Sequence, residues 1–441
     1  MTLSMAGLIG GLALLIVLTI RGMNILIAAP ICALVVALCS GIPLIPPLAP
    51  EGVTSLTDGY MTGFAEFLKK WFIVFLLGAM FGKVMEDSGA ADSVAHAIVE
   101  KLGMRHAAAG VVFACAVLTY GGISVFVVAF SVFPMALSLF KQADLPRRFI
   151  PAALAFGSGT FTMTSAGSME IQNFLPMSYL GTTQYAGALV SFIVAVFMAT
   201  LGMWWFNRML KRAKARGERY EDRGEVAAVR HYKKLPHPLL GLLPLMLVLI
   251  TSFFGSVVLG YGDTSLVLAL LVGLFSATAI YWKNLKDFES AMSASTFGAL
   301  VAISNTCAVV GFGSVAKLTP AFQDSLAYMT AIPGNGLIGA AVAISVIVAL
   351  TGSSSGGQAI ALPLLAPHYL AQGVDPEALH RVIAITSGGL DSLPHNGYVV
   401  TTIRAICGET HRSAYLPIGA LTVIVPLLGS ALAILLFILG L

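Results

Sequence analysis

The sequence predicts an all-α polytopic membrane protein made of two inverted repeats. Hydrophobic residues make up 57% of its 441 residues and charged residues only 10%. A soluble domain is about 45–50% apolar and about 25% charged, so most of this chain is expected to lie in lipid. In addition, one order of sequence features occurs twice, offset by roughly 230 residues. Composition therefore predicts a membrane protein, and the repeated order of features predicts two structurally similar halves.

In each copy an apolar arm runs into a break rich in glycine, serine and threonine, and a second apolar arm follows. A polar connector with an acidic residue and a proline comes next, and then a helix interrupted by small polar residues. These features lie at 118–124, 144–146 and 157–162 in the first copy and at 350–357, 375–376 and 387–391 in the second. Broken hydrophobic segments at matching positions of two halves are typical of a transporter binding site.

Membrane crossing by one helix needs about 20 apolar residues. This criterion predicts spans at about 3–20, 23–42, 64–82, 149–173, 184–206, 238–259, 264–282, 290–316, 379–405 and 414–440. The segment 107–140 would be about 50 Å long as one helix, which is too long for a hydrocarbon core of about 30 Å. Broken at 119–124, it becomes a hairpin with two short arms, and 336–370 behaves in the same way. The distribution of basic residues, described next, is equally consistent with two short full crossings in place of each re-entrant hairpin.

The basic residues orient this arrangement, because cytoplasmic loops carry an excess of lysine and arginine. Ten of the 25 basic residues lie between 207 and 236, which places that linker inside. Treating 107–140 and 336–370 as hairpins leaves every basic cluster inside. The chain then divides into a first repeat at 1–206, with an interrupted helix at 149–173, a cytoplasmic linker at 207–237 and a second repeat at 238–441, with an interrupted helix at 379–405. The two repeats begin on opposite sides.

Other classes of function find little support. The stretch 2–20 lacks the flanks of a cleaved signal peptide and is interpreted as a first membrane helix. The five cysteines show no metal-ligand spacing, so we expect no metal and no cofactor. The basic linker is interpreted as a solvated loop rather than a nucleic-acid surface. Neither a phosphate-binding loop nor a nucleophile–base pattern is present, which disfavours an ATP-driven pump and an enzyme.

The two hairpin tips and the two helix interruptions, together called the four breaks, are the candidate substrate site. Irregular backbone at membrane depth is tolerated only in protein or beside a wet cavity, and the start of a half-helix favours an anion. Four such helix starts could hold a carboxylate without an arginine. Glycine at the tips permits the backbone to approach the ligand closely. The candidate residues are Thr119, Gly121, Gly122, Ser124, Ser158, Gly159, Thr160, Thr162, Ser353, Ser354, Ser355, Gly356, Gln358, Ser387, Gly388, Gly389 and Asn396.

Proton coupling is assigned to a second, smaller set. Ionisable residues inside a span are costly and are functional candidates by default. Asp391 and His395 lie four residues apart, which would place them on one helix face if Pro394 does not distort it. The alternative interpretation is a structural polar pair that satisfies loosened backbone. Glu170 is the third candidate, and its alternative position is the outer surface.

At these motifs the chain resembles the gluconate permease (GntP-type) family of the ion transporter superfamily. The resemblance rests on 157–164, on Ile171-Gln172-Asn173, on the tip 353–358 and above all on the string 387–397. It implies a proton-coupled importer of small hydroxy-acid anions in the bacterial inner membrane. It also implies an elevator mechanism, with hairpins and interrupted helices moving against a homodimeric scaffold. The string DSLPHNG is most similar to members that carry 3-hydroxybutyrate.

We therefore expect a secondary active transporter that carries a small organic anion with protons. Its partners are the anion, protons and the bilayer. A sodium-coupled di/tricarboxylate transporter is one alternative, although the hairpin tips lack the Ser-Asn-Thr that sodium-coupled members of the superfamily often carry. A passive anion channel is the other alternative, and uphill accumulation distinguishes it.

Overall fold

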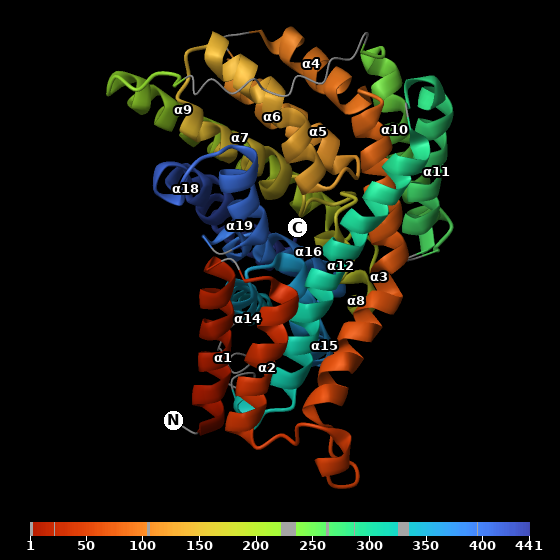
Figure 1. Cartoon of the computed structure of the whole chain (residues 1–441), viewed down its shortest axis with the longest axis vertical. Coiled ribbons are helices and arrows are strands. Elements are labelled where there is room, and N and C mark those ends of the chain that lie inside the picture. The colour runs from red at the N-terminus through yellow and green to blue at the C-terminus, as the bar shows by residue number, and fades with distance from the viewer. Residues whose placement is uncertain are drawn as a thin grey trace.

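The computed structural model describes residues 3–21, 23–103, 106–221, 235–261, 264–285, 287–324, 335–394 and 396–441, and all regular elements in these ranges are helices. Two long helices, α3 (Leu56–Asp87) and α12 (Phe288–Lys317), run side by side and make the most extensive helix–helix contact of the fold (Figure 1). With 32 and 30 residues they are longer than the roughly 20 residues that cross a bilayer directly. They must tilt or extend beyond the hydrocarbon core.

The first half arranges its other helices around this pair. They are α1 (Leu3–Ile20), α2 (Ile25–Ser40), α4 (Ala90–Leu102), α5 (Ala107–Tyr120), α6 (Val125–Gln142), α7 (Ile150–Ala155), α8 (Met177–Leu180) and α9 (Ala188–Ala215). A π-helical turn at Phe156–Thr160 continues α7. Short 3-10 turns lie at Pro46–Leu48, Arg147–Phe149 and Ile171–Asn173.

The second half repeats the order. Its helices are α10 (Pro238–Phe253), α11 (Thr264–Tyr281), α12, α14 (Gly336–Thr351), α15 (Ser354–Ala371), α16 (Pro376–Ser387), α17 (Gly397–Val400), α18 (His411–Gly419) and α19 (Val425–Ile438). Two π-helical turns extend helices: Phe254–Val258 continues α10, and Thr401–Ile406 continues α17. A third, Ala420–Ile424, joins α18 to α19. Short 3-10 turns lie at Trp282–Asn284 and Leu390–Ser392.

The contacts repeat as well as the order. α1 packs on α2 as α10 packs on α11, and α5 packs on α6 as α14 packs on α15. α2 packs on α12 as α11 packs on α3, and α9 packs on α19. Figure 1 shows α14 and α15 near the end that holds α1 and α2, and α5 and α6 near the end that holds α10 and α11. Each helical hairpin therefore lies beside the first helix pair of the other half.

Several elements differ from the expected spans. The helix expected over 149–173 ends at Thr160, and residues 161–187 contain only short turns and the one-turn helix α8, because serine, threonine and glycine there bond locally. α9 runs to Ala215 and takes in the start of the expected linker, where lysine and arginine are good helix formers. α3 is longer than 64–82, and α4 was not expected. The sequence of α4 mixes apolar and charged residues, so its hydropathy is too low to predict a membrane span.

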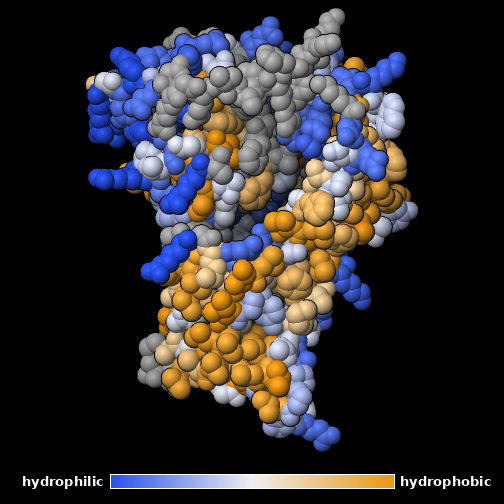
Figure 2. Space-filling view, in the orientation of Figure 1, coloured by the Kyte–Doolittle hydropathy of each residue, from blue (hydrophilic) through white to orange (hydrophobic). Residues whose placement is uncertain are grey.

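The surface agrees with insertion in a bilayer. Among the described residues five helices are long and apolar enough to cross a membrane by length and composition, and four further apolar helices are shorter. Figure 2 shows hydrophobic side chains over α1 and α2 at the lower end and over α10 and α11 on the right. Hydrophilic side chains gather at the upper left, where α9 ends. The fold is that of a multi-pass membrane protein.

Just beyond the end of α9, an ion pair joins the chain to the connector after the first hairpin. Arg148 Nε and Nη2 donate to the two carboxylate oxygens of Glu218 at 2.7 and 3.1 Å. These hydrogen bonds hold the pKa of Glu218 below its usual range. The stabilisation is present above the unfolded pKa of glutamate and is lost as the pH falls through the lowered folded pKa.

We expect Glu218→Gln to lower the melting temperature of the purified protein only slightly at pH 7. A partly exposed pair contributes about 1 kcal/mol or less. The difference from the unchanged protein should shrink in 1 M salt and at pH 3.5, which thermal scans can measure. An effect that is equal at all pH values and salt concentrations would show that the pair does not act electrostatically.

Candidate functional site

The second hairpin tip is a turn that starts a helix. Gly352 ends α14 in the left-handed conformation, with φ 61°, and Ser353 caps α15 by accepting from the Gly356 N–H at 3.2 Å. Ser354, Ser355 and the following residues are buried. The first turn of an 18-residue helix therefore lies inside the protein, and the N–H groups of Ser354 and Ser355 have no acceptor within the helix.

Three separate segments meet at this tip. Gln172, in the irregular segment of the first half, donates from Nε2 to Ser354 Oγ at 2.8 Å. Gln358 is fully buried and donates from Nε2 to the Gln172 carbonyl at 3.1 Å and to Ser387 Oγ at 2.7 Å. We call Gln172, Ser354, Gln358, Ser387 and Asp391 the polar cluster. It joins the irregular segment 161–187 of the first half, the second hairpin and the interruption at 387–391.

Asp391 is the ionisable member of the polar cluster. It lies in the turn Leu390–Ser392, where the helix α16 has ended, and is only 7% exposed. Ser392 Oγ donates to its Oδ1 at 2.9 Å, and the Ser354 hydroxyl also interacts with its carboxylate. Asn396 donates from Nδ2 to the Gly352 carbonyl at 2.9 Å and caps α17. His395 lies outside the described residues.

The first hairpin tip has a different environment. Gly122 adopts φ 99° and packs against Met169, and Gly121 packs against Leu245 of α10. A cavity of about 270 Å³ between α5 and α10 adjoins the tip, and its lining is mainly apolar. The Thr119 hydroxyl has no hydrogen-bond partner among the described residues, and the Ser124 side chain makes no capping hydrogen bond to α6. The structure thus does not bring Thr119, Gly121, Gly122 and Ser124 into the polar cluster.

The hydroxyls of the first break bond mainly to backbone. Ser158 donates to the Leu154 carbonyl at 2.7 Å and pairs with the Tyr398 hydroxyl at 2.9 Å. Thr160 donates to the Leu421 carbonyl at 3.2 Å, and Thr162 bonds the Gly157 and Ser158 carbonyls. These hydroxyls satisfy the π-helical turn and fix it against the second half.

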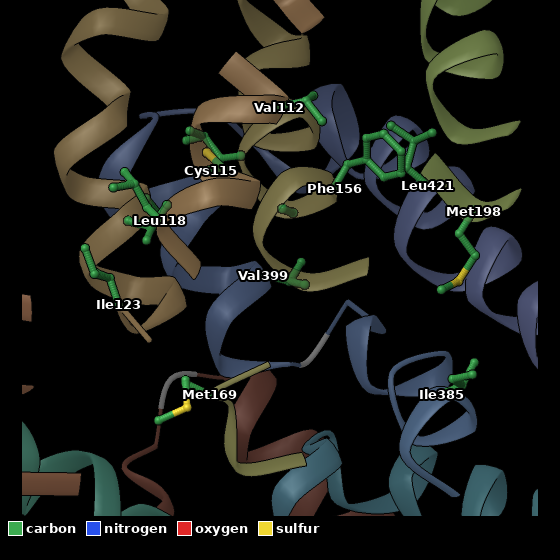
Figure 3. Packing of buried hydrophobic residues seen from close by; sticks show 14 of the residues in the cluster. Val112, Cys115, Leu118, Ile123, Phe156, Met169, Met198, Ile385, Val399 and Leu421 are labelled. Carbon is green, nitrogen blue, oxygen red and sulfur yellow. The ribbon is translucent and has the colours of Figure 1, made fainter. Parts of the chain in front are cut away.

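An apolar core supports these broken segments. In Figure 3, Val112, Cys115 and Leu118 of α5 lie to one side of Phe156, and Leu421 of the second half lies next to Phe156. Val399 lies below Phe156, and Met198 and Ile385 lie on the other side of the view. All of these residues belong to one buried hydrophobic cluster, so side chains of both halves pack around the interrupted helices.

Two features of the site were missed by the sequence analysis. Arg381 on α16 is fully buried and donates only to groups of the first half, although no arginine was expected to matter near a break. Tyr398 links the two breaks through Ser158. The pair His380-Arg381 follows the second acidic connector much as Arg147-Arg148 follows the first, and this parallel is the signal that could have found Arg381.

The remaining candidates are placed as follows. Glu170 is half-buried and directly precedes the turn Ile171–Asn173. Gly388 packs against Thr164 of the first half, and Gly389 packs against Leu427. Ser353 and Ser355 lie within 3.3 Å of each other through their hydroxyls. Among the described residues no group of three or more histidine, cysteine or acidic side chains could hold a metal ion.

Two helical hairpins, two interrupted helices and a buried polar cluster between the halves are features of a multi-pass membrane transporter. A family model for GntP family permeases matches residues 1–392, and the chain belongs to this family. The family consists of transporters, not enzymes. The model ends one residue after Asp391, so it includes every member of the polar cluster.

Individual relatives agree with this assignment. The chain is 34% identical, over 94% of both chains, to the uncharacterized transporter YxjC of Bacillus subtilis. It is 30% identical to the high-affinity gluconate transporter of Escherichia coli over 33% of this chain and 31% of that one. These relatives do not distinguish a 3-hydroxybutyrate branch within the family.

Solved structures share the fold at low identity. The YdaH transporter of Alcanivorax borkumensis superposes with a TM-score of 0.59 and 15% identity, covering 97% of this chain and 99% of that one. MtrF of Neisseria gonorrhoeae, described as one of a class of antimetabolite efflux pumps, superposes with a TM-score of 0.53 and 14% identity, covering 92% and 93%. Identities this low support a common fold only.

Proposed function

We propose that this permease is a secondary active transporter that carries a small hydroxycarboxylate, such as 3-hydroxybutyrate or gluconate, in symport with protons. The observation that carries the proposal is the polar cluster, in which Gln172 of the first half contacts Ser354 and Gln358 of the second hairpin beside Asp391. Both halves and both kinds of broken element contribute to one buried polar site. When the two halves move relative to each other, such a site can open first to one side of the membrane and then to the other.

The carboxylate of the substrate is recognised by the start of α15. The first backbone N–H groups of a helix have no intrahelical acceptor and favour an anion, and here they belong to the buried turn at Ser354 and Ser355. The neighbouring serine hydroxyls supply further donors. A monocarboxylate needs no arginine at this place. The relative named as a high-affinity gluconate transporter supports an anion of this size.

A hydroxyl group of the substrate fits the two amide oxygens of the polar cluster. Oε1 of Gln172 and Oε1 of Gln358 are both buried without a hydrogen-bond partner among the described residues. Leaving a buried acceptor unpaired costs about 1–3 kcal/mol, so a ligand that donates to it gains that amount. A hydroxyl donates where a methylene cannot, which favours hydroxy acids over their deoxy analogues.

Replacing Gln358 by methionine tests this recognition. A site that hydrogen-bonds a hydroxyl can reject the analogue without it by about 10⁴-fold or more. We expect the Gln358→Met protein to lose at least about tenfold of its preference for 3-hydroxybutyrate over butyrate. Competition assays with labelled substrate measure the preference. Gln372→Met, at the exposed end of the same helix, is the control and should keep the full preference.

Asp391 carries the coupled proton in this proposal. Its described contacts are hydroxyls and backbone groups, which offer no full positive charge. Since a buried carboxylate is costly, protonation of Asp391 removes one of two negative charges, and the loaded site then carries only the charge of the bound anion when it changes its access. His395 is the expected partner, and Glu170 is a second candidate from the first half.

We further propose an elevator mechanism in a homodimer of the bacterial inner membrane. The repeated element order, and the two hairpins near opposite ends of the molecule, support inverted repeats that enter from opposite sides (Figure 1). The hairpins and broken helices form the moving part, and the helix pairs α1–α2 and α10–α11 belong to the scaffold.

Uptake into proteoliposomes tests the proposal. A pH gradient should drive uphill accumulation of 3-hydroxybutyrate or gluconate without sodium. Accumulation that requires sodium and ignores the pH gradient supports the sodium-coupled alternative. Equilibration without accumulation under either gradient supports a passive channel.

A further inference from the structure

We propose that Arg381 is a positioning residue for the polar cluster. Its guanidinium holds the irregular segment 161–187 of the first half in the conformation that brings Gln172 to the second hairpin tip. This inference rests on the proposed function, because it takes the polar cluster as the place where substrate binds. Arg381 itself does not contact substrate. It acts on binding through Asn173 and Gln172.

The contacts of Arg381 all cross from the second half to the first. Its side chain is fully buried on α16. Nε donates to the Ala186 carbonyl at 2.9 Å, and Nη2 donates to the Gln184 carbonyl at 3.0 Å. Nη1 donates to the Thr164 carbonyl at 2.7 Å and to Asn173 Oδ1 at 2.9 Å. One side chain thus holds both ends and the middle of a segment of more than 20 residues.

This segment needs such a donor because its own backbone forms only short turns. In a low-dielectric interior each unpaired carbonyl is costly, and neither a helix nor a sheet supplies the partners here. Arginine presents five N–H groups in a rigid planar fork, so it can satisfy several carbonyls at once. Lysine has a point charge and a flexible stem and cannot reproduce the four bonds. The geometry therefore depends on the guanidinium and not only on its charge.

A short path leads from Arg381 to the site. Asn173 accepts from Arg381 and donates from Nδ2 to the Ser168 and Gln184 carbonyls, which fixes the turn Ile171–Asn173. The preceding residue in that turn is Gln172, which donates to Ser354 and accepts from Gln358. A change at Arg381 displaces Gln172 and thereby weakens substrate binding.

The first half contains a matching residue that serves as a control. Arg147 is 3% exposed, follows the first acidic connector and donates from Nη2 to the Cys407 carbonyl of the second half at 2.8 Å. It also faces Glu409 at 3.9 Å. Arg147 lies just before α7 and Arg381 lies within α16, so each half has a buried arginine near its interrupted helix that bonds to the other half. Of the contacts described for these two arginines, those of Arg381 include the turn that holds Gln172.

Maleimide labelling of a reporter cysteine tests the inference without measuring transport. The background is Cys39→Ala, since the other four cysteines are buried. Ile171→Cys places the reporter beside Gln172, at a half-buried position. Adding Arg381→Lys should raise its labelling rate at least about tenfold, which corresponds to about 1.4 kcal/mol of local stability. Adding Arg147→Lys should leave the rate within about twofold, and Cys115 should stay unlabelled in both proteins.

The outcomes separate this inference from the proposed function. Unchanged labelling with Arg381→Lys, or an equal rise with Arg147→Lys, overturns the positioning role. If Arg381→Lys exposes Cys115 and so unfolds the protein, Asn173→Ala replaces it and should raise labelling at position 171 alone; no rise overturns the inference. In uptake assays Arg381→Lys should raise KM about tenfold with a smaller change in Vmax. Selective labelling in a protein that transports no carboxylate would support the positioning role and reject the proposed function.

Discussion

Asp391→Asn is expected to abolish uphill accumulation of substrate driven by a pH gradient, while exchange of labelled for unlabelled substrate across the membrane persists. Asparagine is close in shape to a protonated aspartic acid and cannot release a proton. The substituted side chain therefore stays neutral, and the site can still change its access. Because Asp391 is buried beside Ser354, its loss of charge acts directly at the polar cluster. Proteoliposomes measured in parallel for accumulation and for exchange distinguish the two activities.

The control for this variant is Asp287→Asn. Asp287 caps the start of α12 by accepting from the Ser290 N–H, and asparagine caps helices about as well as aspartate. Its accumulation should equal that of the unchanged protein. Undiminished accumulation by Asp391→Asn would remove Asp391 from the proton path and leave Glu170 or His395 as the candidates.

Gly157→Ala is expected to have the largest effect on stability of any single methyl group added in the broken segments. A Cβ at Gly157 would lie 2.3 Å from the Val112 carbonyl oxygen and 2.7 Å from Cys115 Cβ, so α5 and the π-helical turn must separate. Overpacking of this kind typically costs about 1–3 kcal/mol. The shift also moves Ser158 away from Tyr398. We expect a lower melting temperature in detergent and loss of uptake.

Gly159 provides the matched comparison in the same turn. Apart from the neighbouring residues and backbone of the turn itself, no heavy atom lies within 4 Å of a Cβ at Gly159. Gly159→Ala should therefore keep the melting temperature of the unchanged protein. Equal losses of stability for both substitutions would mean that backbone freedom of the turn, and not the contact with α5, sets the cost.

The positions of the breaks could be predicted from sequence because their chemistry is local. Glycine ends the first helix at each tip, and Ser353 caps the second helix of the second hairpin; the structure has helix ends at Tyr120 and Thr351 and helix starts at Val125 and Ser354. The membrane class followed from composition, and the family assignment agrees with the resemblance found at the motifs. Membership of a 3-hydroxybutyrate branch stays a prediction.

The environment of each break could not be predicted in this way. Thr119 and Gln358 are both small polar candidates in sequence, yet only Gln358 joins the polar cluster. The Thr160 hydroxyl donates to the Leu421 carbonyl of the second half, and the Thr162 hydroxyl donates to the Gly157 carbonyl of its own turn. Such roles depend on which backbone groups lack partners after folding, and this is not a local property of the chain.

By itself the sequence determined that this protein lies in a membrane, where its helices are interrupted and which family it belongs to, because lipid burial, helix breaking and motif identity are all set by residues near one another in the chain. The tertiary structure alone decided which breaks share a site. It placed the Gln172 turn of one half against the hairpin tip of the other, and it placed the buried guanidinium of Arg381 among the carbonyls that hold this arrangement. Contacts between residues about 200 positions apart depend on the packing of both halves, and a single sequence does not encode that packing in any local pattern.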